Sequence, residues 1–246
     1  MPIFDAHAYL AETPFSRAMA SPESVLNTMR RHDITAVALT AGLAADCDFI
    51  AGNRRLREAL DPAQGVFGYL TLNAGYPEES MEEQRKLLMR REFVGAVLFG
   101  HDENPVTLDD ARDILNAHRR YTKPMAIHAP DADAVHAARQ IAAEFTAMRF
   151  ILLTMGGEDW RAAVAAAKQH LNLYLEISGS LDSDKVAVAA ATLTPRKLLY
   201  GSGLPHADPQ LTLGLVEETT TLTGFDRRRV LADNAQTLFH AEPETE

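Results

Sequence analysis

PIFDAHAYL, residues Pro2–Leu10, sets the pattern on which the rest of the chain is built. An apolar run reaches Asp5 and His7 where a short strand would end. Residues two apart on a strand share a face, so we predict that Asp5 and His7 point one way. Phe4 and Ala6 are then expected to point the other way. Polar side chains at the end of a buried strand are typical of a strand that carries a site.

Seven further short apolar runs follow, separated by longer amphipathic stretches. This alternation predicts βαβ units and a parallel sheet. A chain of 246 residues is near the usual size of one (β/α)₈ barrel. We therefore predict a single-domain α/β barrel, with an open doubly wound sheet as the alternative. The predicted strands are Ile3–His7, Ile34–Thr40, Val66–Leu72, Val94–Phe99, Pro124–His128, Arg149–Thr154, Asn172–Ser178 and Lys197–Ser202.

Helix start signals stand between these runs. Ser21 precedes Pro22 as a helix cap precedes its first residue, and Asp208 precedes Pro209 in the same way. Two more caps are predicted, Thr107 for a helix over Leu108–Arg120 and Asp182 for a helix over Val186–Leu193.

The bulk composition excludes several classes of protein. A net charge of -10 repels phosphate backbones, so we expect no nucleic-acid partner. The single Cys47 excludes an internal disulfide and an all-cysteine metal site. With no leader pattern and no run near the roughly 18 apolar residues of a membrane span, we expect a cytoplasmic protein without a membrane partner. We expect one domain over 1–240 and a disordered acidic tail over 241–246. The expected partners are a small-molecule ligand and, as an open alternative, further copies of the same chain in a homo-oligomer.

Four stretches in order resemble the amidohydrolase-related family of TIM-barrel metal-dependent hydrolases. They are PIFDAHAYL, EFVGAVLFG (Glu92–Gly100), RFILLTMGG (Arg149–Gly157) and KLLYGSGLPHADP (Lys197–Pro209), and VLADNAQTLF (Val230–Phe239) resembles the closing helix of that family. The resemblance implies a (β/α)₈ barrel with a metal held at the carboxyl end of the strands.

The resemblance also assigns metal-ligand positions to this chain. His7 and His128 match two of them. Tyr9 stands where relatives carry a second His on the first strand, and Thr154 stands where they often carry another His. Gly203 stands where they carry an Asp. In relatives that Asp also takes the proton from the attacking water, and a glycine offers no acceptor for it. The family mechanism therefore cannot operate here unchanged.

Other polar residues are candidates for a rebuilt site. In LYLEIS, Glu176 is predicted to point into the barrel, where a buried carboxylate needs a partner. An ion pair with His7 or His128 is favoured over a His₂–carboxylate metal site. Tyr9 is expected to donate a hydrogen bond in the space of the lost ligand. His206 is expected over the mouth as an acid, a base or a substrate contact, with a loop residue that orders the turn as the alternative. The candidate catalytic residues are His7, His128, Glu176 and His206, and the candidate metal ligands are His7, His128 and Glu176.

These residues predict a hydrolase that cleaves an amide, ester or lactone of a small molecule. A divalent metal such as Zn²⁺ would be weakly bound or absent. The alternative is a catalytically inactive relative that binds a small ligand or a protein partner in the old pocket. A decarboxylase of the same family is a third reading, which needs the same metal. No phosphate-binding loop, dinucleotide fingerprint or nucleophile elbow is present in the sequence.

Overall fold

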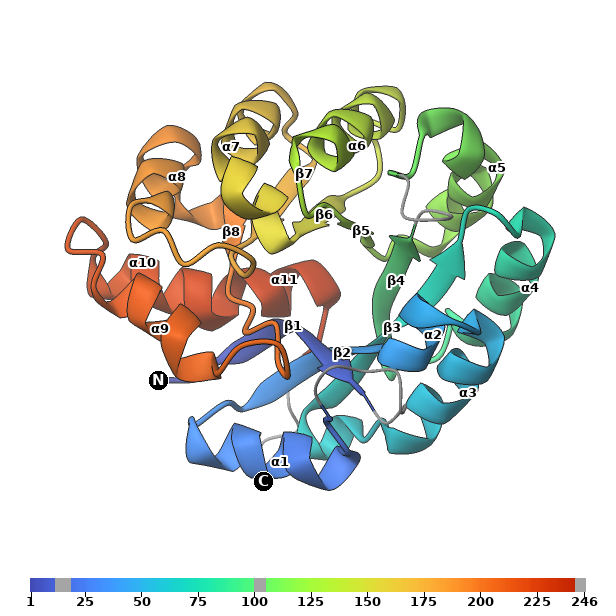
Figure 1. The fold of residues 1–246 in the computed structure, drawn as a ribbon, viewed down its shortest axis with the longest axis horizontal. Helices are drawn as coiled ribbons and strands as arrows, with labels where there is room; N and C mark the ends of the chain where they lie inside the picture. Colours follow the sequence, from blue (N-terminus) through green and yellow to red (C-terminus); the bar gives the residue numbers. More distant parts are fainter. Residues whose placement is uncertain (12–18, 100–104, 242–246) are drawn as a thin grey trace.

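A computed structural model, which describes residues 1–11, 19–99 and 105–241, shows eight strands in one sheet in the order β1 to β8. All neighbouring pairs are parallel, and helices surround the strands (Figure 1). The predicted single-domain (β/α)₈ barrel is thus confirmed. The strands are β1 Phe4–Leu10, β2 Ala36–Ala41, β3 Val66–Asn73, β4 Phe93–Phe99, β5 Met125–His128, β6 Phe150–Leu153, β7 Leu173–Glu176 and β8 Leu198–Leu199.

The barrel closes through backbone that lies beyond the last strand. β8 has only two residues, so the predicted strand over Lys197–Ser202 was too long. The Ala6 N–H donates to the Tyr200 carbonyl at 2.9 Å, and the Gly203 N–H donates to the His7 carbonyl at 2.8 Å. β1 is therefore hydrogen bonded on both sides, to β2 and to the chain that follows β8.

Three of the four predicted helix caps are confirmed. The side chains of Ser21, Thr107 and Asp208 each accept a backbone N–H of the first helical turn. The helices are α1 Pro22–Arg31, α2 Gly42–Asp46, α3 Phe49–Ala59, α4 Pro77–Leu87, α5 Leu108–His118, α6 Ala132–Glu144, α7 Trp160–Gln169, α8 Lys185–Leu193, α9 Pro209–Glu217, α10 Gly224–Arg228 and α11 Asn234–Phe239.

Two helix predictions are corrected. The helix expected to reach Arg120 ends at His118 and continues as a 3₁₀ turn. Asp182 is not the cap of α8, because that helix begins at Lys185 after Asp184. The Asp182 carboxylate instead accepts the Asp184 N–H at 2.9 Å and the indole N–H of Trp160 at 3.0 Å. It joins the start of α8 to the start of α7.

The end of the chain packs against the barrel interior. The Phe239 ring of α11 lies 5.4 Å from the Phe4 ring and 5.8 Å from the Tyr69 ring, centroid to centroid. Ala241 is buried in the same cluster, while residues 242–246 of the predicted acidic tail lie outside the described residues. Because apolar side chains fill this part of the barrel, a site is expected at the carboxyl end of the strands.

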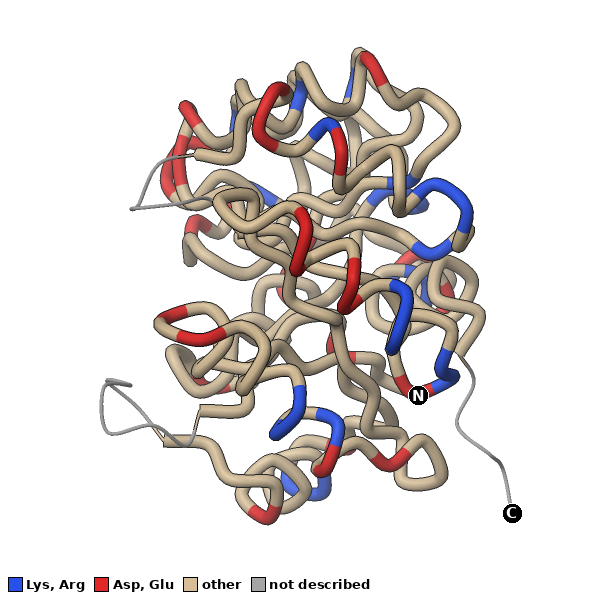
Figure 2. Tube along the Cα trace, turned by 90° about the vertical axis from the view of Figure 1, so that its right-hand side faces the viewer, with Lys and Arg blue, Asp and Glu red and all other residues tan. Residues whose placement is uncertain are grey.

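Acidic side chains lie at the start of several helices, and basic side chains lie at the end of α1. Asp48, Asp131 and Asp208 cap helix starts, whereas Arg30 and Arg31 occupy the last turn of α1. This arrangement complements the helix dipole. Many of the Lys and Arg residues lie on the same side of the molecule as the N-terminus (Figure 2). None of the described helices is long and apolar enough to cross a membrane.

Candidate functional site

A cavity of about 940 Å³ opens among the loops that follow the strands. His7, His128 and His206 all line it, so three of the predicted site residues share one space. Glu176 is fully buried and does not line the cavity. Tyr9 and Ser178, which sequence reasoning placed near strand ends, belong to the cavity wall as well.

An irregularity in β1 brings His7 and Tyr9 to this wall. The register of β1 against β2 shifts between Asp5 and Ala8. Phe4 packs with the residues inside the barrel, yet His7 and Tyr9 also face inward. The predicted strict alternation of faces is therefore wrong, because the bulge inserts a residue and reverses which side chains of the strand point inward.

The Asp5 carboxylate lies at this irregularity. It accepts the backbone N–H of His7 at 3.1 Å and that of Ser202 at 2.9 Å. Burial raises the pKa of Asp5 to about 6, although the hydrogen bonds from Ser202 and His7 lower it. Asp5 thus fixes the backbone around His7 to the loop after β8, and its oxygens are directed at the protein.

Glu176 lies beneath the cavity and is hydrogen bonded to several donors. Its Oε2 atom is 2.7 Å from Nδ1 of His7, and it accepts the Thr154 N–H at 2.9 Å and the Ser178 hydroxyl at 2.8 Å. Burial by itself raises the pKa of Glu176, but His7 and these hydrogen bonds hold it below the ordinary value. Of the two predicted roles for Glu176, the contacts are those of the pairing with His7.

The pairing decides how His7 presents its ring. A carboxylate beside Nδ1 favours the tautomer with the proton on Nδ1, which leaves a lone pair on Nε2. The Nε2 atom is buried and has no hydrogen-bond partner among the described residues. The Ser178 hydroxyl also lies 3.2 Å from Nδ1. His7 therefore offers a free acceptor atom beside the cavity.

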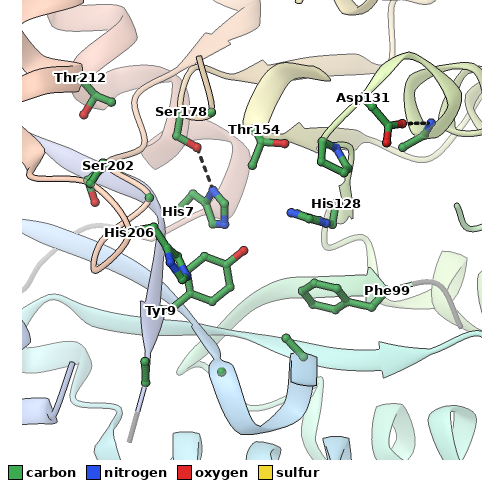
Figure 3. Close-up of a pocket in the computed structure, with 18 of the residues that line it drawn as sticks. His7, Tyr9, Phe99, His128, Asp131, Thr154, Ser178, Ser202, His206 and Thr212 are labelled. Atoms are coloured by element: carbon green, nitrogen blue, oxygen red, sulfur yellow. Dashed lines mark hydrogen bonds between the residues drawn. The ribbon is translucent and has the colours of Figure 1, made fainter. Parts of the chain in front are cut away.

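Aromatic rings surround this acceptor. The Tyr9 ring lies 4.9 Å from the His7 ring and 5.3 Å from the His206 ring. Burial raises the pKa of Tyr9 above its ordinary value and lowers the pKa of His128 to about 4, so both are neutral at pH 7. The His128 ring lies 5.5 Å from Phe99. In Figure 3 the Tyr9 hydroxyl faces the space between His7 and His128.

The residues present do not fit the metal that the family resemblance implies. Tyr9, Thr154 and Gly203 line the cavity at three of the expected ligand positions. Among residues 1–11, 19–99 and 105–241, no three His, Cys, Asp or Glu side chains are placed to hold one ion. His7 and His128 thus do not form a ligand set with Glu176, whose Oε2 atom already contacts three donor groups, from His7, Thr154 and Ser178.

Sequence reasoning missed Lys185. This side chain is fully buried, and its Nζ atom donates to the Ser178 carbonyl at 3.3 Å and to the Ser180 carbonyl. Burial lowers the pKa of Lys185 to about 8. It holds the loop whose Ser178 and Gly179 line the cavity. No signal in the sequence marks it, since lysine is usually exposed.

Comparisons with known proteins agree with this barrel. The family model described as amidohydrolase matches residues 3–241. A 2,6-dihydroxybenzoate decarboxylase from Rhizobium has a TM-score of 0.74 and 15% identity, covering 98% of this chain and 99% of that chain. A 5-carboxyvanillate decarboxylase from Sphingomonas paucimobilis has a TM-score of 0.75 and 13% identity, covering 98% and 99%. A dihydroxybenzoic acid decarboxylase from Polaromonas, solved with bound manganese and 2-nitroresorcinol, has a TM-score of 0.71 and 16% identity, covering 97% and 96%.

At these identities the structural likeness shows the fold alone. No curated protein matches the sequence. The family model, by contrast, spans nearly the whole chain, from the residue before β1 to the second residue after α11. This chain therefore belongs to the amidohydrolase family.

Proposed function

We propose that this protein hydrolyses an uncharged ester, lactone or amide of a small molecule, with His7 as the base and without a bound metal. One observation carries the proposal. Nδ1 of His7 is held by the Glu176 carboxylate at 2.7 Å, while Nε2 has no partner among the described residues. A histidine oriented by a buried carboxylate is the arrangement that general-base catalysis uses.

The reaction follows from these atoms. Nε2 of His7 takes a proton from water as the water oxygen attacks the carbonyl carbon. The carboxylate of Glu176 then stabilises the imidazolium ring, since Oε2 lies against Nδ1. When the tetrahedral intermediate collapses, the same Nε2 returns the proton to the departing oxygen or nitrogen. His7 is the catalytic residue, and Glu176 is a positioning residue that substrate does not touch.

Decarboxylation, named for several similar structures, has less support. A carboxylate substrate needs a cationic partner. Among the described residues the cavity wall includes the carboxylates of Asp46 and Asp131 but no Lys or Arg. This charge pattern favours a substrate without a carboxylate.

A panel of neutral lactones and aryl esters tests the proposal in the presence of a chelator. We expect turnover by the wild type and a loss of about 10²–10⁴-fold in kcat for His7→Gln. His136→Gln is the matched control, because His136 is exposed on α6. Equal turnover by His7→Gln would contradict the proposal. No turnover of any substrate would favour the alternative, a relative that only binds a ligand.

A further inference from the structure

We propose that the Tyr9 hydroxyl is a catalytic hydrogen-bond donor to the carbonyl oxygen of the bound substrate. This inference rests on the proposed function and extends it, because it names the group that stabilises the negative charge developing on the carbonyl oxygen. That group is the phenol O–H of Tyr9 on β1, beside the His7 ring.

The Tyr9 ring is held in a fixed position at the cavity wall. Tyr9 follows His7 by two residues, and the irregular register of β1 turns both side chains to the cavity. The ring is held between His7, at 4.9 Å with 60° between planes, and His206, at 5.3 Å with 80°. The Tyr9 N–H donates to the Leu204 carbonyl at 2.7 Å. Backbone and ring contacts therefore fix the direction of the phenol.

The hydroxyl itself is available to a ligand. It makes no hydrogen bond with any described residue, and in Figure 3 it faces the space between His7 and His128. A phenol is both donor and acceptor, with an ordinary pKa of about 10. An oriented O–H group that faces the cavity without a protein partner is suited to an oxygen atom of a ligand.

The chemistry needs a donor at this place. As Nε2 of His7 removes a proton from water, negative charge builds on the carbonyl oxygen. A fixed donor aimed at that oxygen typically contributes about 10²–10³-fold in kcat. Tyr9 and His7 are adjacent on one strand face, so one carbonyl group can lie within reach of both.

A ligand that forms a tetrahedral hydrate tests the donor without any turnover. The probe is 2,2,2-trifluoroacetophenone, whose binding is followed by fluorine NMR. We expect the wild type to bind it and Tyr9→Phe to bind it about tenfold more weakly or worse. Tyr121→Phe, in the 3₁₀ turn after α5, is the control and should bind as the wild type does. Tyr9→Met replaces Tyr9→Phe if that variant does not fold.

Failure of this inference is distinguishable from failure of the proposed function. If the wild type does not bind the probe, or if Tyr9→Phe binds it as tightly, the assignment of Tyr9 is overturned. If binding depends on Tyr9 but no lactone or ester is turned over, the donor role stands and the hydrolase proposal fails. On a substrate that is turned over, Tyr9→Phe should lower kcat by about 10²-fold or more with little change in KM.

Discussion

His7 on β1 and Glu176 on β7, two strands apart around the barrel, are hydrogen bonded, with 2.7 Å between Nδ1 and Oε2. The same Oε2 atom accepts the Thr154 N–H at the end of β6. One buried carboxylate thus orients the ring that faces the cavity and fixes the neighbouring strand end. Because Glu176 is fully buried, it positions these groups, and His7 is the residue that can contact substrate.

Glu176→Gln should preserve the size of this side chain and remove its negative charge. A glutamine must present an N–H₂ group to one of the donors now bound by Glu176, and it cannot stabilise a charged His7 ring. We expect kcat to fall about 100-fold or more on any ester or lactone that the wild type hydrolyses. Asp133→Asn, an exposed carboxylate on α6 outside the cavity wall, is the control and should stay within about twofold.

Gly201→Ala should disturb the same carboxylate from the other side. A Cβ atom at Gly201 would lie 2.1 Å from Oε1 of Glu176, closer than any packing allows. We expect about 1–3 kcal/mol of lost stability in urea unfolding, together with lost turnover. Gly214→Ala in α9 meets nothing within 4 Å and should gain about 0.5–1 kcal/mol. Equal stability of the Gly201→Ala variant and the wild type would show that Glu176 is not closely packed there.

The stability of the protein should depend on pH through His118. This residue is buried in α5, and its Nε2 atom lies 2.9 Å from the Lys123 carbonyl. Burial lowers the pKa of His118 to about 4. An unfolded histidine has a pKa of about 6.5. Between these values the unfolded chain binds more protons, so the free energy of unfolding falls as the pH falls.

His118→Gln should therefore flatten the pH dependence of stability. We expect the difference between pH 6.5 and 4 to shrink by up to about 3 kcal/mol in urea unfolding. The exposed His136→Gln variant should keep the wild-type slope. If the His118→Gln and wild-type curves run parallel, His118 is not held neutral in the folded state.

The existence and order of the strands could be predicted because the signals are local. Short apolar runs and capping residues such as Ser21 and Thr107 occur within a few positions of the structure they set. The length of β8 could not be predicted, because it depends on how Tyr200 and Gly203 pair with β1, far away in the sequence. The register shift in β1 lies beside a second contact that is distant in sequence, in which the Asp5 carboxylate accepts the Ser202 N–H.

The site shows the same division. His128 ends β5 as predicted, whereas β1 continues past His7 to Leu10, so the predicted strand end at His7 is wrong. Both side chains nevertheless line the cavity. The inward direction of Glu176 also follows from alternation, but its choice of His7 over His128 depends on the register of several strands. The burial of Lys185 has no sequence signal, since two loop carbonyls rather than an acid hold its amine.

Metal content and turnover measured on the same samples test the central claim most directly. Protein is dialysed against a chelator, analysed for metals, and assayed on a neutral lactone or ester before and after addition of Mn²⁺ or Zn²⁺. Because His7 is oriented by Glu176 and no three-ligand group exists among the described residues, we predict unchanged kcat with metal far below one ion per chain. Activity that disappears on chelation and returns in proportion to bound metal would contradict the account.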